Sequence, residues 1–423
     1  MKEEFLYYVW QYKLFSMTKL TTTNGKSIVI KKAGLQNNNA GPDFLNAQIE
    51  IDNQLWAGNV EMHLKSSDWY LHKHETDINY DAVILHVVWQ HDVDVFTKSD
   101  KTLPTLELQD IVDKSILKNY EELLYQKTTF IPCGIQLKTV DQFLIDNWLE
   151  RLYFERLEEK SLLINELLSK TNDNFEAVLF QLLAKNFGLK INGNAFLEMA
   201  KSIDFSIIKK TSFNEGQISA LFYGQSGFLE DDLEIDYYTK LKQEYHFLQH
   251  KFGLVPISKN NFQFFRMRPP NFPTIRIAQL AALYHLHQHL FSKLMKVKSK
   301  EEVYELFEVE VNLFWKTHYT FETSSKKTNK KLSKSFIDLL LINTIIPLKF
   351  VYLKQKGENQ ESVLLKLIQQ VAPEKNAVIS KFSESKIKAK NAMESQALLM
   401  LKNNYCTKKL CLQCAIGNHL LRK

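Results

Sequence analysis

The pattern of apolar and polar residues predicts strands and one helix in the first part of the chain. The helix is expected at 4–15, and strands are expected at 27–31, 47–51, 59–65, 82–89 and 105–108. Asp52 and Asn53, between two of these strands, are typical of a tight turn and predict a hairpin. The run from Ala82 to Trp89 is almost entirely apolar, which predicts a central strand buried on both faces.

After Pro132 apolar residues recur every three or four positions, which predicts helices. These are expected at 144–168, 175–187, 194–203, 231–250, 275–295 and 300–314. The Lys- and Ser-rich stretch Ser324–Ser335 predicts a loop that links domains, and helices resume after it. The fold class is therefore α+β: a small mixed α/β N-terminal domain (1–130), a large helical domain (131–323) and a helical C-terminal segment (336–423).

Composition is that of an ordinary globular protein, with 45% apolar and 24% charged residues. This excludes a disordered, a collagen-like and a wholly membrane-embedded protein. The longest apolar stretch, Phe336–Leu353, contains four residues that interrupt it: Asp338, Asn343, Pro347 and Lys349. It is expected to be buried core, so no membrane partner is predicted. The charged start of the chain has no apolar segment after it, which predicts a cytoplasmic protein.

Positive charge is concentrated late in the chain. Residues 321–423 contain 19 Lys or Arg and 7 Asp or Glu, a formal charge of +12 that leaves −6 on the rest. This distribution is compatible with a polyanion such as nucleic acid, and equally with a solvated Lys-rich face. Arg266, Arg268 and Arg276 are three of only six arginines, and phenylalanines are interleaved with them. They are expected either to bind phosphates beside stacked bases, or to pair with acids while the phenyl rings fill the core.

The clearest candidate site lies between Gly41 and Lys65. Asp43 precedes one strand of the predicted hairpin, and Glu61, His63 and Lys65 alternate with apolar residues along the next. Period-two geometry places these three polar side chains on one face. Carboxylates that hold Mg²⁺ or Mn²⁺, next to a base or cation that orients water, are what metal-dependent hydrolysis requires. The alternative is an amphipathic edge strand whose polar face meets solvent.

Pro42-Asp43, followed after seventeen residues by Glu61-Met62-His63, resembles the signature of the PD-(D/E)xK nuclease superfamily. The order helix–strand–hairpin–helix–strand is also similar to its core. The resemblance implies that Asp43 and Glu61 bind metal, that Glu4 supplies an extra carboxylate, and that a side chain two positions after Glu61 assists the water. Here that residue is His63, where the superfamily has Lys, and Lys65 lies one strand repeat further on. Either His63 replaces the Lys or the site is degenerate.

Longer motifs are similar to those of an uncharacterised bacterial family, known as a domain of unknown function. They are the segments 41–44, 56–69, 266–276 and 406–417. This resemblance implies a stand-alone cytoplasmic protein and implies nothing about activity.

Histidines gather in the same region, since 5 of the 12 lie between positions 63 and 91. His72 and His74 are expected either to supply metal ligands or phosphate contacts near the Glu61 strand, or to be surface histidines of a loop.

The cysteines form a second candidate site. Three of the four cysteines, Cys406, Cys411 and Cys414, lie within a segment of nine residues. Their spacing equals that of the first three ligands of plant-type [2Fe–2S] ferredoxins, and it also suits structural zinc. Cys133 or His419 is the expected fourth ligand. The alternative is a set of buried, incidental thiols.

These observations together favour a metal-dependent, nuclease-like protein that hydrolyses DNA or RNA phosphodiesters. One alternative is a catalytically inactive nuclease fold that binds nucleic acid or acts as a scaffold. Another is a hydrolase of a small phosphorylated ligand. Nothing in the sequence indicates an oligomeric state.

Overall fold

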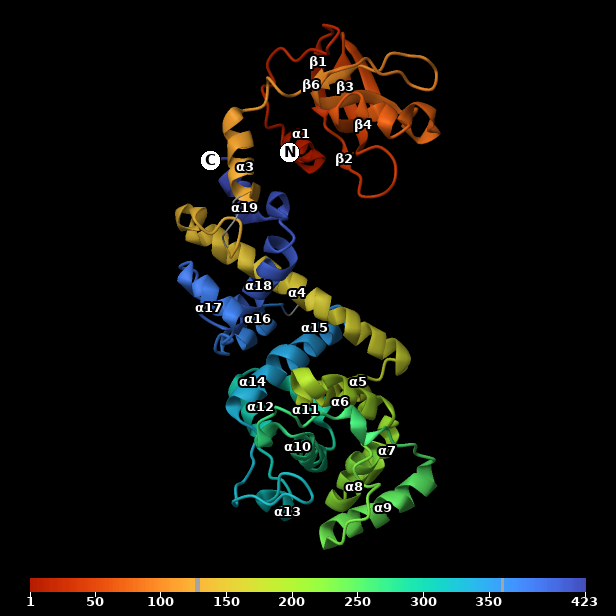
Figure 1. Ribbon diagram of the computed structural model, residues 1–423, viewed down its shortest axis with the longest axis vertical. Coiled ribbons are helices and arrows are strands. Elements are labelled where there is room, and N and C mark those ends of the chain that lie inside the picture. Colours follow the sequence, from red (N-terminus) through yellow and green to blue (C-terminus); the bar gives the residue numbers. More distant parts are fainter. Residues whose placement is uncertain (126–129, 359–360) are drawn as a thin grey trace. The chain divides into compact units, whose positions relative to one another are not determined.

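The computed structural model describes residues 1–125, 130–358 and 361–423 (Figure 1). About 55% of the chain is helical, with an N-terminal curled sheet and a large helical region, which confirms the α+β class. The chain forms two compact units that are interleaved in sequence. Unit 1 contains residues 1–148, 384–386 and 401–423, and unit 2 contains residues 149–383 and 387–400.

This division differs from the three ranges expected from the sequence. The terminal residues 401–423 belong to unit 1, because α19 (Ala415–Leu421) packs against α3 (Lys114–Tyr125). The side-chain amide of Asn119 donates to the carbonyl of Leu421 at 3.3 Å. The Ser324–Ser335 loop lies inside unit 2, where Gln279 donates to the carbonyl of Lys330 at 2.7 Å.

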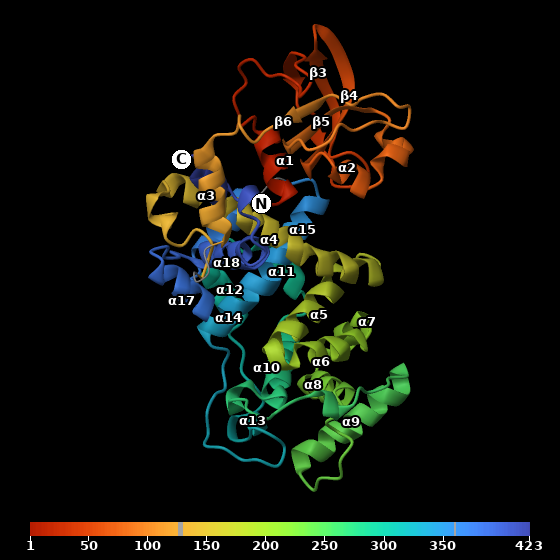
Figure 2. The same ribbon diagram turned by 45° about the horizontal axis from the view of Figure 1, so that its top comes forward.

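Unit 1 is built on a six-stranded sheet of order β1-β3-β4-β5-β6, with β2 paired to β3 (Figure 2). The strands are β1 (Ile28–Lys32), β2 (Leu35–Gln36), β3 (Phe44–Ile51), β4 (Gln54–Lys65), β5 (Val83–Gln90) and β6 (Thr105–Glu107). The pairs β1–β3 and β3–β4 are antiparallel, whereas β5 runs parallel to β4 and β6 parallel to β5. The crossover from β4 to β5 contains α2 (Asp68–Leu71) and two short 3₁₀ turns, His74–Thr76 and Ile78–Tyr80.

Local sequence explains the geometry of the strands. Asp52 and Asn53 adopt φ angles of 49° and 66°, the left-handed conformation of a two-residue hairpin turn, so the predicted hairpin is confirmed. β5 lies between β4 and β6, as predicted for a buried central strand. β3 carries a bulge at Asn46, whose φ is 59°, and the pairing with β4 shifts there. Bulges re-aim nearby side chains, and this one lies three residues from Asp43.

The first helix covers one part of the sheet. α1 (Glu3–Gln11) packs against β4 and buries one apolar face made of Phe5, Leu6, Tyr8, Val9 and Trp10. The indole N–H of Trp10 donates to the carbonyl of Ala33 at 3.0 Å. Glu3 and Tyr7 are one turn apart and lie outside that buried stripe.

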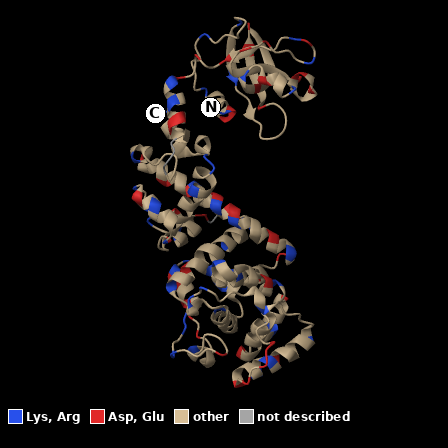
Figure 3. Ribbon diagram, in the orientation of Figure 1, with Lys and Arg blue, Asp and Glu red and all other residues tan. Residues whose placement is uncertain are grey.

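Unit 2 is helical, and acidic and basic residues alternate along its surface helices such as α4 in Figure 3. Its long helices are α4 (Gln142–Lys170, which begins in unit 1), α5 (Phe175–Phe187), α6 (Leu189–Lys201), α8 (Glu215–Gln225), α9 (Asp236–Phe252), α10 (Pro273–Leu286) and α15 (Ile346–Gln355). The shorter ones are α7 (Phe205–Thr211), α11 (Leu290–Lys296), α12 (Lys300–Leu306), α13 (Leu313–Thr317), α14 (Lys334–Leu340), α16 (Glu361–Gln369), α17 (Ala377–Glu384) and α18 (Ala392–Met400).

Two helix predictions were wrong in extent. The predicted helix at 275–295 is divided into α10 and α11, because His287 takes an extended conformation with φ −127° and ψ 90°. Its ring Nε2 lies 2.8 Å from the carbonyl oxygen of Leu306, a contact that replaces the continuing helix. The predicted helix at 300–314 ends at Leu306, and an extended segment leads from there to α13.

The apolar stretch near residue 340 is a core element, as predicted. The helical segment Lys334–Gln355 is long and apolar enough to cross a membrane, but 78% of its most apolar window is buried inside the protein. Such burial is typical of the core helix of a folded domain.

Candidate metal centre

The pairing of β3 with β4 brings Asp43 and Glu61 together. Phe44 pairs with Val60, so the residues beside this pair are neighbours on adjacent strands. The amide N–H of Asp43 donates to Oε2 of Glu61 at 3.1 Å, and the amide N–H of Met62 donates to Oδ2 of Asp43 at 3.0 Å. These reciprocal hydrogen bonds hold the two carboxylates side by side.

The loop before β3 fixes the position of Asp43. Gly41 has a φ of +105°, a conformation that side chains other than hydrogen disfavour. Asn37 closes the loop, because its side-chain amide donates to the carbonyl of Pro42 at 3.0 Å and its backbone N–H donates to the carbonyl of Asp43 at 2.7 Å. The carboxylate of Asp43 is thus presented from a constrained turn.

Burying two neighbouring carboxyl groups disfavours their charged forms, and a bound cation would offset that cost. Burial raises the pKa of Asp43 to about 7, and the nearby Glu61 adds to the rise. Burial raises the pKa of Glu61 to about 8, and Glu3 adds to that rise. In the part of the chain that the structure describes, neither carboxylate has a Lys or Arg nitrogen within 4.0 Å. Buried carboxylates need such compensation, and a divalent cation supplies it.

Histidines surround the Glu61 side of this pair. His63 lies two residues after Glu61 and therefore on the same face of β4, and His86 of β5 pairs with Glu61 on that face. Nδ1 of His63 lies 2.8 Å from Nε2 of His86. Nε2 of His63 lies 3.0 Å from Nδ1 of His72 and 3.6 Å from Oε1 of Glu61.

The crossover between β4 and β5 places His72 and His74 beside Glu61 and His63. His72 ends α2, His74 begins the next 3₁₀ turn, and Lys73 between them has a φ of 61°. This left-handed residue reverses the chain locally, so that both rings approach β4. Nε2 of His74 lies 3.2 Å from Oε1 of Glu61, and the ring stacks on Tyr80 with centroids 3.7 Å apart.

Three of these histidines lie close enough together to hold one metal ion. One nitrogen from each of His63, His72 and His74 can be chosen so that all three lie within 4.8 Å of one another. Burial lowers the pKa of His63 to about 2 and that of His86 to about 3, and neighbouring imidazoles add to both shifts. Nε2 of His74 is buried and makes no hydrogen bond with the described residues. This nitrogen lies 3.2 Å from the Glu61 carboxylate, a separation that suits a shared metal ion.

Comparison with known proteins identifies the family of this chain. A family model described as "Protein of unknown function (DUF2851)" matches residues 3–377. The chain belongs to this family. No curated protein and no solved structure matches it. The matched range includes Asp43, Glu61 and the three clustered histidines, whereas the cysteines at 406, 411 and 414 lie beyond it.

Helix α1 contributes residues to the surroundings of Asp43 and Glu61 that the sequence did not reveal. The hydroxyl of Tyr7 hydrogen-bonds to the Asp43 carboxylate, and Glu3 acts electrostatically on both Asp43 and Glu61. Glu4, the residue expected to supply the extra carboxylate, is exposed and acts instead on Tyr120. One residue along a helix is a rotation of about 100°, so neighbours face different surroundings. The one-turn spacing of Glu3 and Tyr7, which places both residues on the same side of α1, is the sequence feature that could have identified them.

Lys65 lies at the exposed end of β4. Its backbone N–H donates to Oδ2 of Asp68 at 3.0 Å, and its ammonium interacts electrostatically with Asp92. Its contacts do not include Asp43 or Glu61 among the described interactions.

The three arginines are in two different environments within unit 2. Arg266 and Arg268 are exposed, and Arg266 stands over the ring of Phe265, which is itself 76% exposed. Arg276 is buried and donates to Asn271 at 2.7 Å and to Gln279 at 2.9 Å. Its guanidinium also stacks on Phe336 at 3.6 Å. This placement does not fit the phosphate contact predicted for Arg276, whereas Arg266 and Arg268 are accessible.

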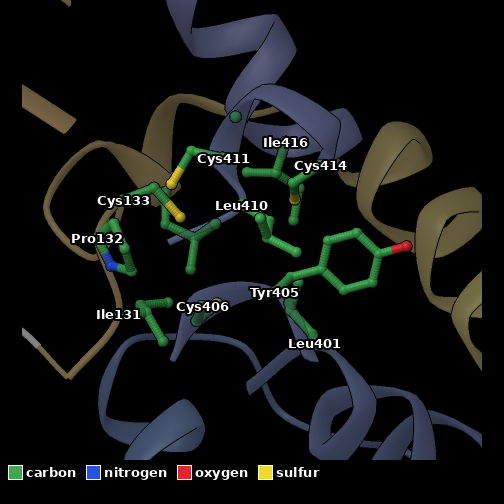
Figure 4. Close-up of a pocket in the computed structure, with 12 residues that line it drawn as sticks. Ile131, Pro132, Cys133, Leu401, Tyr405, Cys406, Leu410, Cys411, Cys414 and Ile416 are labelled. Carbon is green, nitrogen blue, oxygen red and sulfur yellow. The ribbon is translucent and has the colours of Figure 1, made fainter. Parts of the chain in front are cut away.

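All four cysteines line one pocket of unit 1 (Figure 4). Each thiol is free, and burial raises the pKa of Cys133 and that of Cys411 to about 12, to which the neighbouring thiols contribute. His419, the other expected fourth ligand, is not among the residues that line this pocket.

Proposed function

We propose that this protein is a metal-dependent phosphodiesterase of the nuclease type, acting on DNA or RNA. The observation that carries the proposal is the buried pair Asp43 and Glu61, with the nitrogen atoms of three histidines beside it and no Lys or Arg partner within the described residues. Such a set of ligands is suited to a divalent cation and costs free energy without one.

The order of elements in unit 1 supports this class of enzyme. A helix, an antiparallel three-strand meander (β1, β3, β4), a crossover and a parallel strand follow one another. Asp43 stands at the start of the second meander strand, and Glu61-Met62-His63 lies in the third. This arrangement resembles the PD-(D/E)xK core, in which the corresponding Asp and Glu bind the metal.

His63 takes a role different from that of the Lys it replaces. It is only 1% exposed, and its lowered pKa keeps it neutral, so it does not supply a positive charge. A neutral His63 that donates from Nδ1 to His86 keeps a lone pair on Nε2, the nitrogen that lies 3.0 Å from Nδ1 of His72 and 3.6 Å from Oε1 of Glu61. We assign His63, His72 and His74 as metal ligands together with Asp43 and Glu61.

A divalent ion held by Asp43, Glu61 and the histidines would lower the pKa of a bound water and polarise a phosphoryl oxygen. The protein's own residues orient the ligands: Tyr7 holds Asp43, His86 holds His63, and Tyr80 holds the ring of His74. Imidazole ligands favour transition metals, while Mg²⁺ prefers oxygen ligands. Of the two ions expected from the sequence, the histidines favour Mn²⁺ over Mg²⁺.

Unit 2 offers groups for the nucleic acid backbone. Arg266 and Arg268 are exposed for phosphate contacts, and Phe265 beside them offers a ring on which a base can stack. The nucleic-acid partner is inferred from these residues and from the excess of Lys in residues 321–423.

A second candidate function is a nuclease fold without turnover that binds nucleic acid or acts as a scaffold. Among the described residues no Lys nitrogen lies within 4.0 Å of the Asp43 or Glu61 carboxylate, which favours this function, and Lys65 interacts with Asp92 instead. A hydrolase of a small phosphorylated ligand remains the third alternative, and the choice of substrate in one assay separates it from the other two.

The test is cleavage of labelled single- and double-stranded DNA and RNA with Mn²⁺, Mg²⁺ or Zn²⁺. Wild type is compared with Glu61→Gln and with Glu50→Gln, a control on β3 whose carboxylate pairs with Lys31 at 3.0 Å. We expect Mn²⁺-dependent cleavage that Glu61→Gln loses and Glu50→Gln retains. Nucleic acid binding by the wild type without cleavage under any of the ions would favour the scaffold function, and hydrolysis of small phosphate esters alone would favour the third.

A further inference from the structure

Every cysteine of the chain converges on one pocket of unit 1, although the four come from separate turns. Cys133 lies in the loop after α3, and Cys406 ends the π-helical segment Leu401–Cys406. Cys411 begins a 3₁₀ turn, Cys411–Gln413, and Cys414 caps α19. In Figure 4 the sulfur atoms of Cys133 and Cys411 point toward one another. Residues that are more than 270 positions apart in the sequence therefore meet at this pocket.

The terminal turns are shaped to present sulfur atoms. Burial raises the pKa of the Cys414 thiol, and the backbone N–H groups of Gly417 and Ile416 oppose that rise. Gly417 packs so closely on the Cys411 carbonyl that a Cβ at this position would collide with it. Backbone amides that donate to sulfur stabilise a thiolate and are typical of metal-bound cysteines.

Two ammonium groups flank the pocket. The Lys402 ammonium acts on Cys406 and donates to the carbonyl of Phe130 at 2.8 Å. The Lys409 ammonium acts on Cys411 and donates to the carbonyl of Leu124 at 3.0 Å. Both are thus held by backbone carbonyls beside the cysteines. Positive charge there offsets the negative charge of a centre with four thiolates.

The arrangement is not that of a disulfide or of a reactive thiol. All four cysteines are free, and three of them are at most 8% exposed, namely Cys133, Cys411 and Cys414. A nucleophilic cysteine needs access to its substrate and an electropositive opening, which burial at this depth denies.

We propose that Cys133, Cys406, Cys411 and Cys414 ligate an iron–sulfur cluster that joins the C-terminal segment to the loop after α3. The spacing Cys-x₄-Cys-x₂-Cys with one distant cysteine is a known pattern for such clusters. A single zinc ion with four thiolate ligands is the alternative, and the metal content of the protein decides between the two.

The cluster is independent of the phosphodiesterase activity, since no residue is shared with the site of Asp43 and Glu61. Its role is structural: it holds residues 401–423 in unit 1, beside α3 and α1. No redox step is required of it.

The experiment is the metal and sulfide content of the full-length protein purified without oxygen. We expect a brown protein with iron and acid-labile sulfide in equal amounts. Cys133→Ser and Cys411→Ser should each lose most of the iron, while His419→Ala, a change on the same terminal helix, should retain it. Iron kept in Cys133→Ser but lost in His419→Ala would overturn the ligand assignment.

Wild-type protein alone also decides the question if the serine variants do not fold. Colourless protein with stoichiometric zinc would overturn the cluster in favour of a single ion. Protein that contains neither metal, also after incubation with ferrous iron and sulfide under reducing conditions, would overturn the metal centre altogether.

Discussion

Asp43 and Glu61 are linked directly: the amide N–H of Asp43 donates to Oε2 of Glu61 at 3.1 Å. The bond holds two buried carboxyl groups at a distance where their charges repel, and burial raises the pKa of both. The pair is therefore unfavourable for the stability of the metal-free protein. In other sites such pairs are kept because a cation binds between them.

A first prediction concerns the stability of Glu61→Gln. At pH 9 in the presence of EDTA, above the pKa of about 8 that burial gives Glu61, this variant should be more stable than wild type by about 1 kcal/mol, because a buried charge next to Asp43 is removed. Mn²⁺ at a hundred times its Kd should stabilise wild type by about 2.7 kcal/mol and leave the variant unchanged. Thermal and denaturant unfolding with EDTA and with Mn²⁺ measure both effects. An equal response of both proteins to Mn²⁺ would contradict the assignment of Glu61.

A second prediction tests His86 as the residue that positions His63. His86 lies 2.8 Å from Nδ1 of His63 and is fully buried, but it is not assigned as a ligand. His86→Leu should weaken Mn²⁺ binding by about 10- to 100-fold without removing it, since a partner that orients a ligand is lost. Isothermal titration with Mn²⁺ measures this.

The control for His86 is His91→Leu, which changes a histidine that pairs with Asp94 at 3.4 Å. This variant should bind Mn²⁺ like wild type. Equal losses in the two variants would mean that His86 acts only through general stability.

A third prediction separates the arginines of unit 2. Arg268→Ala should weaken binding to DNA or RNA and reduce the slope of log K against log salt by about 1, the effect of one lost phosphate contact. Arg276→Met should leave that slope unchanged. Because it leaves the oxygens of Asn271 and Gln279 without their donor, it should instead destabilise unit 2 by about 1–3 kcal/mol. A fall in slope for Arg276→Met would contradict its structural role.

A fourth prediction concerns Gly417. The added Cβ of Gly417→Ala would collide with the carbonyl of Cys411, so α19 must shift away from the cysteine turn. We expect a loss of about 1–3 kcal/mol in stability and a lower iron content. Iron analysis and denaturant unfolding measure these, with Ala415→Ser on the same helix as the control. Unchanged iron and stability would show that the turn tolerates the shift.

Local patterns in the sequence predicted much of unit 1. The turn at Asp52-Asn53 and the alternation along 59–65 sufficed to align Glu61 with His63, because period-two geometry needs no long-range information. The helical region was also predictable from apolar periodicity. The break at His287 was not, since the residues on both sides continue the helical pattern and the contact with Leu306 decides the conformation.

Long-range pairing decided the rest of the site. His86 lies beside His63 because of the parallel register of β4 and β5, which local sequence patterns do not determine. His72 and His74 reach β4 because Lys73 adopts a left-handed conformation that lysine rarely takes. The sequence left open whether Arg276 contacts phosphates or has a structural role, because spacing along the chain does not reveal that its helix is buried.

The central claim is that Asp43, Glu61 and the histidines form a metal centre, and metal stoichiometry tests it most directly. Isothermal titration of EDTA-treated full-length protein with Mn²⁺ is compared with the same titration of His72→Ala/His74→Ala. The account predicts Mn²⁺ binding that saturates in wild type and a large loss of affinity in the double variant. Binding of equal affinity in both proteins, or no binding by wild type to Mn²⁺ or Zn²⁺, would contradict it.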